Sequence, residues 1–398
     1  MSTTPDAILA VNAGSSSLKF ALYPRHGREI GAARLSGNIE GLEPGGAPVI
    51  KLSGKDGNSS ESLGASYGDS FERALNALDQ ALAQHAEGIS INAIAHRIVH
   101  GGDRLSDSVL LDADMLDYLA GLSPLAPLHQ PHNLAGVRAF QRNFPQLPQV
   151  GCFDTAFHAS LPETEQLFAL PKTLRTSGIR RYGFHGLSYR YVTDRLLEHS
   201  SRASGRMIIA HLGNGASACA VANGKSAATT MGFSALDGLM MGTRCGSVDP
   251  GVLLHLLRQG WNMEQLERML YRESGLRGIS GISADMRTLH ASDDPAAKLA
   301  IDIFAHRLVR ECGALTACLG GLDVIAFTGG IGEHDASLRR RACTALAYLG
   351  IRIDEAANLA ATGDAIAAIH ADDSNVEIWV VPTDEGRVAA QDAARLIS

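Results

Sequence analysis

Apolar and polar positions near the start of the chain predict two strands joined by a short turn. A continuous apolar run at 7–11 ends in small polar residues at 12–17, and an alternating run follows at 18–23. Continuous apolar runs are typical of buried strands, and alternation is typical of strands with one buried face. The pattern therefore predicts a β-hairpin with a Gly/Ser turn.

The second half of the chain begins in the same way. An apolar run at 207–212 meets the small polar segment 213–217, and a strand-like segment follows at 218–222. Asn223-Gly224 comes next and is the strongest short sequence signal for a tight hairpin. The repeat of strand, small turn and strand indicates a weak internal duplication, in pattern rather than in letters.

Helical and strand-like segments follow each other along the rest of the chain. Apolar spacing predicts helices at 71–86, 252–258, 263–272 and 296–319, and strands at 94–99 and 324–327. The Gly- and Ser-rich segment 41–68 predicts surface loops and edge strands. A third small turn is predicted at 328–332, before a helix rich in Ala and Arg. Strands interleaved with helices predict an α/β fold in layers.

Length, charge and cysteine spacing narrow the class of protein. A chain of 398 residues is longer than chains that fold around one hydrophobic core usually are, which predicts two domains. Lys and Arg number 35 against 42 Asp and Glu, with no basic block, which argues against a nucleic-acid or membrane surface. The N-terminus lacks a signal-peptide pattern, and no apolar stretch reaches the ~18–20 residues of a membrane span. The six cysteines are scattered without a Cys-x-x-Cys pair, so we expect reduced thiols in a cytoplasmic protein.

The three small turns, at 12–17, 213–217 and 328–332, are candidates for phosphate binding. Gly, Ser and Thr let backbone N–H groups approach an anion, and three such turns at strand ends favour a phosphate ligand. Familiar nucleotide motifs do not fit, because Cys219 stands where a P-loop needs Gly and a strand is predicted after Gly213 where a Rossmann site needs a helix. No Gly-x-Ser-x-Gly elbow is present, which argues against a serine hydrolase.

Charged and imidazole residues stand in strands and glycine-flanked loops. Arg97 lies in an apolar strand, Asp154 follows a short apolar strand, and His185 and Arg244 lie between glycines. Each alone is more often a structural residue. Together they suit phosphoryl transfer, in which the protein aligns the substrates and neutralises charge. Lys19 follows the first turn as a further cation, although a solvent-facing strand lysine explains it equally well.

Several motifs are similar, in order along the chain, to those of the acetate kinases. The first two are Val11-Asn12-Ala13-Gly14-Ser15-Ser16-Ser17-Leu18-Lys19-Phe20, and His211-Leu212-Gly213-Asn214-Gly215-Ala216-Ser217 with Thr230-Met231-Gly232-Phe233. Further matching stretches are 95–102, 153–158, 182–188, 238–250, 328–333 and 382–385. The similarity runs from Ala7 to Ile397, so the chain resembles this family over nearly its whole length.

This resemblance implies a fold and a reaction. The acetate and sugar kinase/actin superfamily has an α/β fold of duplicated ribonuclease-H-like (actin-like ATPase) domains around a central cleft. The N-terminal domain would be 1–154 plus 387–398, and the C-terminal, nucleotide-binding domain would be 155–386. The family converts a short carboxylate and MgATP reversibly into an acyl phosphate and ADP by direct in-line transfer, usually as a homodimer. Acetate and ATP are the implied substrates, and Mg²⁺, with Mn²⁺ as an alternative, is the implied metal.

The resemblance also implies roles for single residues. Asn12 and Glu385 would hold Mg²⁺, and Arg97 would grip the substrate carboxylate. His185 and Arg244 would stabilise the transition state. Asp154 stands at the position described as a proton donor or acceptor, but a carboxylate substrate has no proton to lose at pH 7, so we expect Asp154 to orient an arginine or a metal-bound water. The residues implied for ATP are Lys19, His211, Leu212, Gly213, Asn214, Gly215, Asp285, Met286, Arg287, Gly330, Ile331, Gly332, Glu333 and His334.

The implied acyl pocket is lined by Val99, Leu128, Phe184 and Ala235. The family often has Pro at the last position, and the loss of ring atoms enlarges the pocket slightly. One methylene is worth only ~1–3 kcal/mol of discrimination, so acetate is the expected substrate and propionate the alternative. Other departures from the family are Cys245 where Ser is common, His334 where Asn is common, and Gly386 after the single Glu385. The last leaves one carboxylate rather than two near the metal.

Two interpretations from other classes stay open. One is an ATPase-only or non-catalytic member of the superfamily, although ATP hydrolysis alone would not require Arg97, Arg244 and His185 together. ADP release that depends on the acid would exclude it. The other is a dehydrogenase, which a lack of stabilisation by NAD would exclude.

Overall fold

The computed structural model describes most of the chain. The described residues are 5–14, 16–43, 46–54, 57–63, 70–86 and 88–398. Ser15, in the predicted turn at 12–17, lies outside them, as do residues 44–45, 55–56 and 64–68 of the segment 41–68.

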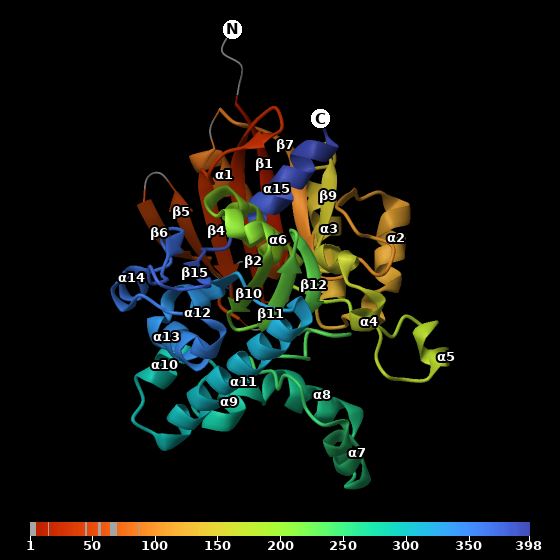
Figure 1. The fold of residues 1–398 in the computed structure, drawn as a ribbon. Helices are drawn as coiled ribbons and strands as arrows, with labels where there is room; N and C mark the ends of the chain where they lie inside the picture. Colours follow the sequence, from red (N-terminus) through yellow and green to blue (C-terminus); the bar gives the residue numbers. More distant parts are fainter. Residues whose placement is uncertain (1–4, 15, 44–45, 55–56, 64–69, 87) are drawn as a thin grey trace. The chain divides into compact units, whose positions relative to one another are not determined.

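The chain divides into two compact units (Figure 1). The first unit is Met1–Ala156 with Asp384–Ser398, and the second is Phe157–Thr383. The domain boundaries implied by the resemblance, 1–154 with 387–398 and 155–386, stay a prediction.

The first unit is built on a mixed sheet. Its elements are β1 (Asp6–Ala13), β2 (Ser17–His26), β3 (Glu29–Ile30), β4 (Leu35–Glu40), β5 (Val49–Gly54), β6 (Gly57–Ser62), α1 (Ser70–His85), β7 (Ser90–Ile98), β8 (Val109–Leu110), α2 (Ala113–Gly121), α3 (Gln130–Asn143), β9 (Gln149–Phe153) and α15 (Glu385–Leu396). β1 and β2 form the predicted antiparallel hairpin, and β4 continues it antiparallel to β2. On the other side of β1 follow the parallel strands β7 and β9.

The second unit repeats this arrangement. Its elements are α4 (Glu163–Gln166), α5 (Lys172–Arg175), α6 (Gly186–His199), β10 (Arg206–Leu212), β11 (Ala216–Ala222), β12 (Lys225–Thr229), α7 (Pro250–Arg258), α8 (Met263–Arg272), α9 (Gly275–Ser280), α10 (Met286–His290), α11 (Pro295–Leu319), β13 (Val324–Thr328), α12 (Gly329–His334), α13 (Ala336–Ala345), α14 (Glu355–Ala360), β14 (Ala367–Ala368) and β15 (Glu377–Val380). β10, β11 and β12 form an antiparallel meander, and β13 and β15 extend it in parallel beyond β10.

The two sheets therefore share one strand order. It reads β4-β2-β1-β7-β9 in the first unit and β12-β11-β10-β13-β15 in the second. An antiparallel meander extended from its first strand by two parallel strands is the ribonuclease-H-like order. The predicted fold class, a duplicated α/β domain, is confirmed.

Alternation along the strands explains how helices cover both faces of each sheet. Ala7, Leu9, Val11 and Ala13 of β1 pack in one core with α1 and α3, so the residues between them face the other side, where α15 lies against β1 and β7. In the second unit α6 packs against one face of β10, and α11 lies against β10, β11 and β12.

Most of the predicted elements are confirmed within a few residues. The predicted turn at Asn223-Gly224 has both residues at positive φ, 51° and 73°, as a tight type I′ hairpin turn requires. The predicted turn at 328–332 is wrong, because the helix α12 spans Gly329–His334. Gly329, at φ 75°, breaks the strand after Thr328, and the chain enters the helix at once. Within the described part of the chain, no helix is both long and apolar enough to cross a bilayer.

Candidate active site

Polar residues stand at the carboxyl ends of three neighbouring strands of the first sheet. Asn12 is the penultimate residue of β1, Arg97 is the penultimate residue of β7, and Asp154 directly follows β9. Parallel pairing of β1 with β7 and of β7 with β9 brings these positions to one edge. Ligands of α/β proteins bind at this end of parallel strands.

The guanidinium of Arg97 is held by several oxygen atoms. Its Nε and Nη2 donate to the two carboxylate oxygens of Asp154 at 3.1 and 2.5 Å, and Nη1 donates to Asn12 Oδ1 at 3.3 Å. Glu385 Oε2 lies 3.4 Å from Nε. Burial lowers the pKa of Arg97, but the charges of Asp154 and Glu385 and the hydrogen bond to Asp154 outweigh burial and raise the pKa. The bidentate contact supports the expectation that the buried Asp154 orients an arginine.

A pocket of about 160 Å³ lies beside this cluster. Four of the residues implied by the resemblance line it, namely Asn12, Lys19, Arg97 and Glu385. Asn12 and Lys19 are direct cross-strand partners, so the β1–β2 hairpin fixes their spacing. The other lining residues are Ala10, Val11, Phe20, Ala21, Tyr23, Gly386 and Ala389.

Tyr23 and Gly386 were not predicted as parts of one contact. Tyr23 Oη donates to Asp384 Oδ1 at 2.5 Å, and a Cβ built on Gly386 would lie 2.5 Å from the same hydroxyl. A second glutamate after Glu385 would therefore displace the tyrosine ring, which explains the glycine. No local sequence signal could reveal this contact, because Tyr23 and Gly386 are far apart in the chain.

Val99 and Leu128, two residues of the implied acyl pocket, also belong to the first unit. Val99 is buried directly after β7, and its backbone N donates to Asn133 Oδ1 at 3.0 Å. Asn133 Nδ2 in turn donates to the carbonyl of Ala13 at 2.6 Å, so α3 ties the ends of β1 and β7 together. Leu128 is half-buried shortly before α3.

In the second unit, His185 has a strained backbone. It stands at φ 59° and ψ 24° at the start of α6, a conformation that costs a non-glycine residue on the order of 1–3 kcal/mol. Its Nδ1 is hydrogen-bonded to Ser217 Oγ at 2.8 Å, and its ring stacks on that of His211 with centroids 4.3 Å apart. The preceding carbonyl, that of the buried Phe184, lies 2.9 Å from His158 Nε2. Burial lowers the pKa of His158 to about 4.

Arg244 reaches the glycine turn between β10 and β11. Its Nη1 donates to the carbonyl of the half-buried Ala235 at 3.2 Å. A Cβ built on Gly215 would lie 3.7 Å from that nitrogen and 3.5 Å from His185 Nε2. The two residues implied for transition-state stabilisation therefore meet beside Gly215. The backbone N of Gly242, in the same loop as Arg244, donates to the Asn214 carbonyl at 2.9 Å.

Two of the segments implied for ATP, 211–215 and 330–334, lie at the carboxyl ends of β10 and β13. Because His211 pairs with Thr328 in the parallel register, the turn 213–215 and helix α12 begin at the same edge. A Cβ on Gly330 would meet nothing within 4 Å, so the backbone of this glycine is open to a ligand. Leu212, Met286 and Gly332 are buried, Ile331 is half-buried, and Gly330 and His334 are exposed.

Asp285 and Arg287 form a local ion pair at the start of α10. Asp285 accepts from Arg287 Nη2 at 2.6 Å and from the Arg287 backbone N at 2.8 Å. The side-chain hydrogen bond from Arg287 lowers the pKa of Asp285 to about 2. His290 Nε2 lies 2.8 Å from Asp335 Oδ2, which connects α10 to the residue after His334.

The carboxylate of Glu333 is turned towards backbone groups of its own unit. Its Oε1 accepts from Gly329 N at 2.8 Å and from Thr383 N at 3.1 Å. Thr383 Oγ1 donates to Ser188 Oγ at 2.9 Å, and Ser188 is hydrogen-bonded to His211 Nδ1 at 2.8 Å. Glu333 thus links helix α12 to the segment that leads to Glu385, a role with no sequence signal.

The residues that line the pocket beside Arg97 fit Mg²⁺. Among the described residues, no group of three or more His, Cys, Asp and Glu side chains could hold a metal ion. Mg²⁺ usually keeps several waters and binds through one or two protein oxygens and the phosphates of a substrate. The amide oxygen of Asn12 and the carboxylate of Glu385, which line one pocket, are such a donor pair.

The implied site residues thus form two sets, one in each unit. Asn12, Lys19, Arg97, Asp154 and Glu385 come together in the first unit. His185, His211, Gly215 and Arg244 come together in the second. Convergence of the two sets on one cleft stays a prediction.

Known proteins are similar to this chain over nearly its whole length. The profile of the Acetokinase family matches residues 7–391. An acetate kinase of Rhodopseudomonas palustris is 47% identical, over 98% of each chain. The crystal structure of Porphyromonas gingivalis acetate kinase has a TM-score of 0.88 at 35% identity, over 99% of this chain and 100% of that one. A propionate kinase from Francisella tularensis has the same TM-score at 38% identity, over 97% and 98%.

Proposed function

This chain belongs to the acetokinase family, and from that premise we propose that it is a phosphotransferase that makes acetyl phosphate and ADP from acetate and MgATP. A carboxylate oxygen of acetate attacks the γ-phosphorus, the bond from that phosphorus to the β–γ bridging oxygen breaks, and ADP leaves with the electron pair. No proton has to move at pH 7, because both the nucleophile and the leaving group are anions. The protein therefore has to align the two substrates and neutralise their negative charge, and it does not have to remove a proton.

The observation that carries this proposal is the cluster around Arg97. Asp154 and Asn12 hold the guanidinium of Arg97 in a fixed orientation, beside a pocket that Arg97 and Lys19 both line. A planar guanidinium matches the two oxygens of a carboxylate or phosphate. Arg97 binds the acetate carboxylate, Asp154 holds Arg97 in place, and Lys19 meets the nucleotide phosphates.

His185 and Arg244 stabilise the charge on the transferred phosphoryl group. Donors that are fixed before the reaction cost no reorganisation as charge moves over the equatorial oxygens. The hydrogen bond between His185 and Ser217 and the one that Arg244 donates to the Ala235 carbonyl supply this rigidity. Asn12 and Glu385 would hold Mg²⁺, which neutralises charge on the β- and γ-phosphates when it is bound.

Acetate is the preferred acid, and propionate is the alternative. Ala235 is smaller than the proline that is common in the family, and a propionate kinase is among the similar structures. An apolar pocket discriminates between two acids that differ by one methylene by only ~1–3 kcal/mol. Ala235 therefore leaves propionate as the alternative.

The experiment is an ADP-coupled assay with formate, acetate, propionate and butyrate, with hydroxylamine trapping of the acyl phosphate. We expect ADP release that depends on the acid, with the largest kcat/KM for acetate. Release of ADP at the same rate without any acid would contradict the proposal and favour an ATPase.

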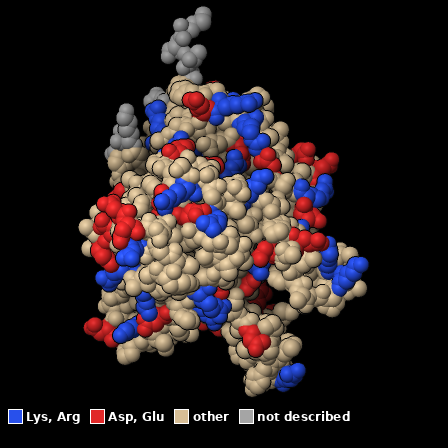
Figure 2. Space-filling model, viewed as in Figure 1, with Lys and Arg blue, Asp and Glu red and all other residues tan. Residues whose placement is uncertain are grey.

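We propose further that the protein is a homodimer. Helices α7 and α8 carry apolar side chains that the rest of the chain leaves exposed, and the surface over α7 is mostly uncharged on the face seen in Figure 2. These side chains are Val252, Leu254, Leu257 and Met263, and Met263 is 76% exposed. Exposed apolar side chains of this kind are typical of protein–protein contacts.

A further inference from the structure

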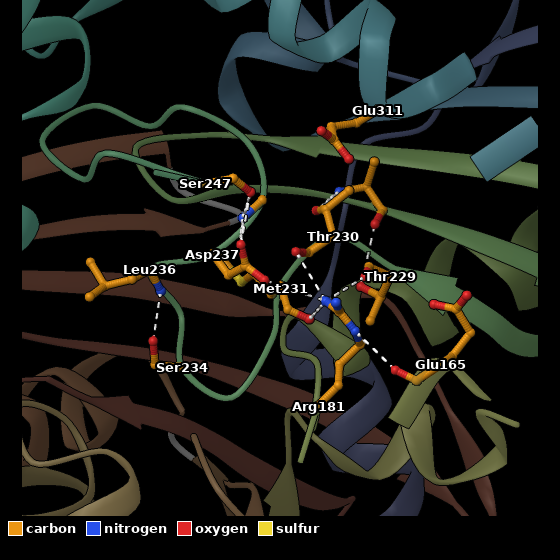
Figure 3. A network of polar contacts seen from close by, with 12 residues as sticks. Glu165, Arg181, Thr229, Thr230, Met231, Ser234, Leu236, Asp237, Ser247 and Glu311 are labelled. Carbon is orange, nitrogen blue, oxygen red and sulfur yellow. Dashed lines mark hydrogen bonds and ion pairs between the residues drawn. The ribbon is translucent and has the colours of Figure 1, made fainter. Parts of the chain in front are cut away.

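Arg181 stands at the centre of a network of polar contacts in the second unit (Figure 3). Its Nη1 donates to the carbonyls of Thr229, Thr230 and Met231, at 3.1, 3.4 and 3.0 Å, and its Nε donates to the carbonyl of Glu165 at 3.1 Å. The three consecutive carbonyls belong to the chain as it leaves β12. A guanidinium is suited to this place because its donors point in fixed directions.

Backbone hydrogen bonds join the same two segments. Tyr182 N and Gly183 N both donate to the carbonyl of Gly232, at 3.0 and 3.3 Å. The segment 181–183 therefore holds the segment 229–232 through one side chain and two amides. The same segment 181–183 leads directly to His185.

Asp237 extends the network to the far end of the loop after β12. Its Oδ2 lies 3.6 Å from Arg181 Nη1, and its Oδ1 accepts from Gly238 N and from Ser247 Oγ, both at 2.8 Å (Figure 3). Gly238 has φ 89°, and a Cβ there would lie 2.5 Å from the Thr230 carbonyl. The loop is thus held at both of its ends, at 229–231 by Arg181 and at 238 and 247 by Asp237.

The loop between these anchors carries two residues of the proposed reaction. Ala235 lines the acyl pocket, and Arg244 donates to its carbonyl at 3.2 Å. A shift at either anchor moves both of them, and a misplacement of about 1 Å can cost as much as 10²-fold in rate.

We infer that Arg181 and Asp237 are a positioning pair that fixes Ala235 and Arg244, and thereby sets turnover and acyl-chain selectivity; this inference rests on the proposed function. Arg181 acts through the carbonyls of the loop, and Asp237 acts through the turn that follows Ala235. The guanidinium is only partly exposed, 19% for its side chain, so the contacts are shielded from water more than those of a surface pair.

The test compares Arg181→Ala, Arg181→Lys and Asp237→Asn with the wild-type protein. The control is Arg352→Ala, which removes a guanidinium paired with Asp373 where both side chains are about two-thirds exposed. Arg181→Lys keeps the charge and can donate to one or two of the three carbonyls, but it cannot reproduce the fork.

We expect kcat with acetate to fall about tenfold or more in Arg181→Ala and Asp237→Asn, with the KM for ATP within about twofold of wild type. The ratio of kcat/KM for acetate to that for propionate should fall as the pocket wall loosens, and Arg181→Lys should recover part of both losses. Hydrogen–deuterium exchange should become faster at 229–247 and stay unchanged in the strands β10, β11 and β13. Arg352→Ala should match the wild type throughout.

Folded variants with wild-type turnover, wild-type selectivity and unchanged exchange at 229–247 would overturn the inference. Faster exchange over the whole second unit, with no rescue by lysine, would also overturn it, because the pair would then be a general stabiliser. If the wild-type protein makes no acyl phosphate from any acid, the proposed function fails, while the exchange data still decide whether the pair fixes the loop.

Discussion

In the proposed function, Arg97 is the residue on which substrate binding depends most. Asp154 accepts hydrogen bonds from two nitrogens of Arg97 and is itself 1% exposed. Each of the two charges is therefore neutralised by the other. Removing one member of a buried ion pair typically costs about 3–5 kcal/mol, because the remaining charge has no partner. The pair is therefore a structural unit as well as the proposed binding group.

At this scale we predict different kinetic effects for the two arginines. Arg97→Ala, with Arg97→Lys as the variant that keeps a charge beside Asp154, should raise the KM for acetate more than about tenfold, since the fork that binds the carboxylate is lost. Arg244→Ala should lower kcat by about 10²–10³-fold, the typical effect of removing one transition-state donor. Steady-state kinetics measure both, and near-wild-type values in both variants would refute the assignment.

The buried histidines predict how stability changes with pH. Burial lowers the pKa of His96, His100 and His158 to about 4, against 6.5 in the unfolded chain. Between about pH 4 and pH 6.5 the unfolded state therefore binds more protons than the folded state. The free energy of unfolding rises as the pH increases through this range, and it falls as the solution is acidified. We expect a loss on the order of 1–2 kcal/mol for each histidine between pH 7 and pH 5. Urea unfolding at several pH values measures it, with His158→Gln expected to show a shallower slope; a flat profile would exclude this origin.

At the scale of elements, the strands of both hairpins follow from the apolar pattern because each is buried. Ile8, Leu9, Ile208 and Ile209 are all fully buried, and a continuous apolar run predicts that condition. Helix α12 could not be predicted in this way. Its sequence Gly-Gly-Ile-Gly-Glu-His has poor helix formers, and tertiary contacts stabilise it instead.

Arg339 on α13 is one such contact. Its side chain is fully buried and donates to the carbonyls of Gly332 and Glu333 at the end of α12, and to Asn358 and Ala361. In the sequence it is one of three consecutive arginines, so nothing local distinguishes it. The role of Arg181 could not be predicted from the sequence either, because its partners are carbonyls far away in the chain.

We predict that Arg339→Met weakens the nucleotide site through α12. The variant leaves several buried carbonyls without a donor, which should lower the free energy of unfolding by about 3 kcal/mol or more. The KM for ATP should rise while the KM for acetate stays the same. Arg341→Ala is the matched control, since Arg341 is 45% exposed and pairs with Asp302 on the surface. Equal effects on both KM values would show that α12 is not the element affected.

At the scale of the whole molecule, one strand order occurs twice and carries two different sets of groups at its carboxyl edges. The first sheet presents Asn12, Arg97 and Asp154, and the second presents His211 and the loops around it. The family resemblance implied both sets, but no pattern in the sequence alone could show which residues touch, because the contacts join strands that are distant in the chain.

The homodimer is the prediction that concerns assembly. Leu254→Glu combined with Leu257→Glu places charges on the exposed apolar face of α7 and should convert a dimer into a monomer of 42.0 kDa. Sedimentation velocity distinguishes the two masses. An unchanged dimer would place the interface elsewhere, and a wild-type monomer would refute the dimer.

The most direct measurement follows the oxygen atoms of the acid. If acetate attacks phosphorus, acetyl phosphate made from ATP and acetate labelled with ¹⁸O at both carboxylate oxygens must carry label in the bridge between carbon and phosphorus. ³¹P NMR should then show a single acetyl phosphate resonance shifted by the isotope. Inorganic phosphate as the only product, or acetyl phosphate whose resonance carries no isotope shift, would contradict the account.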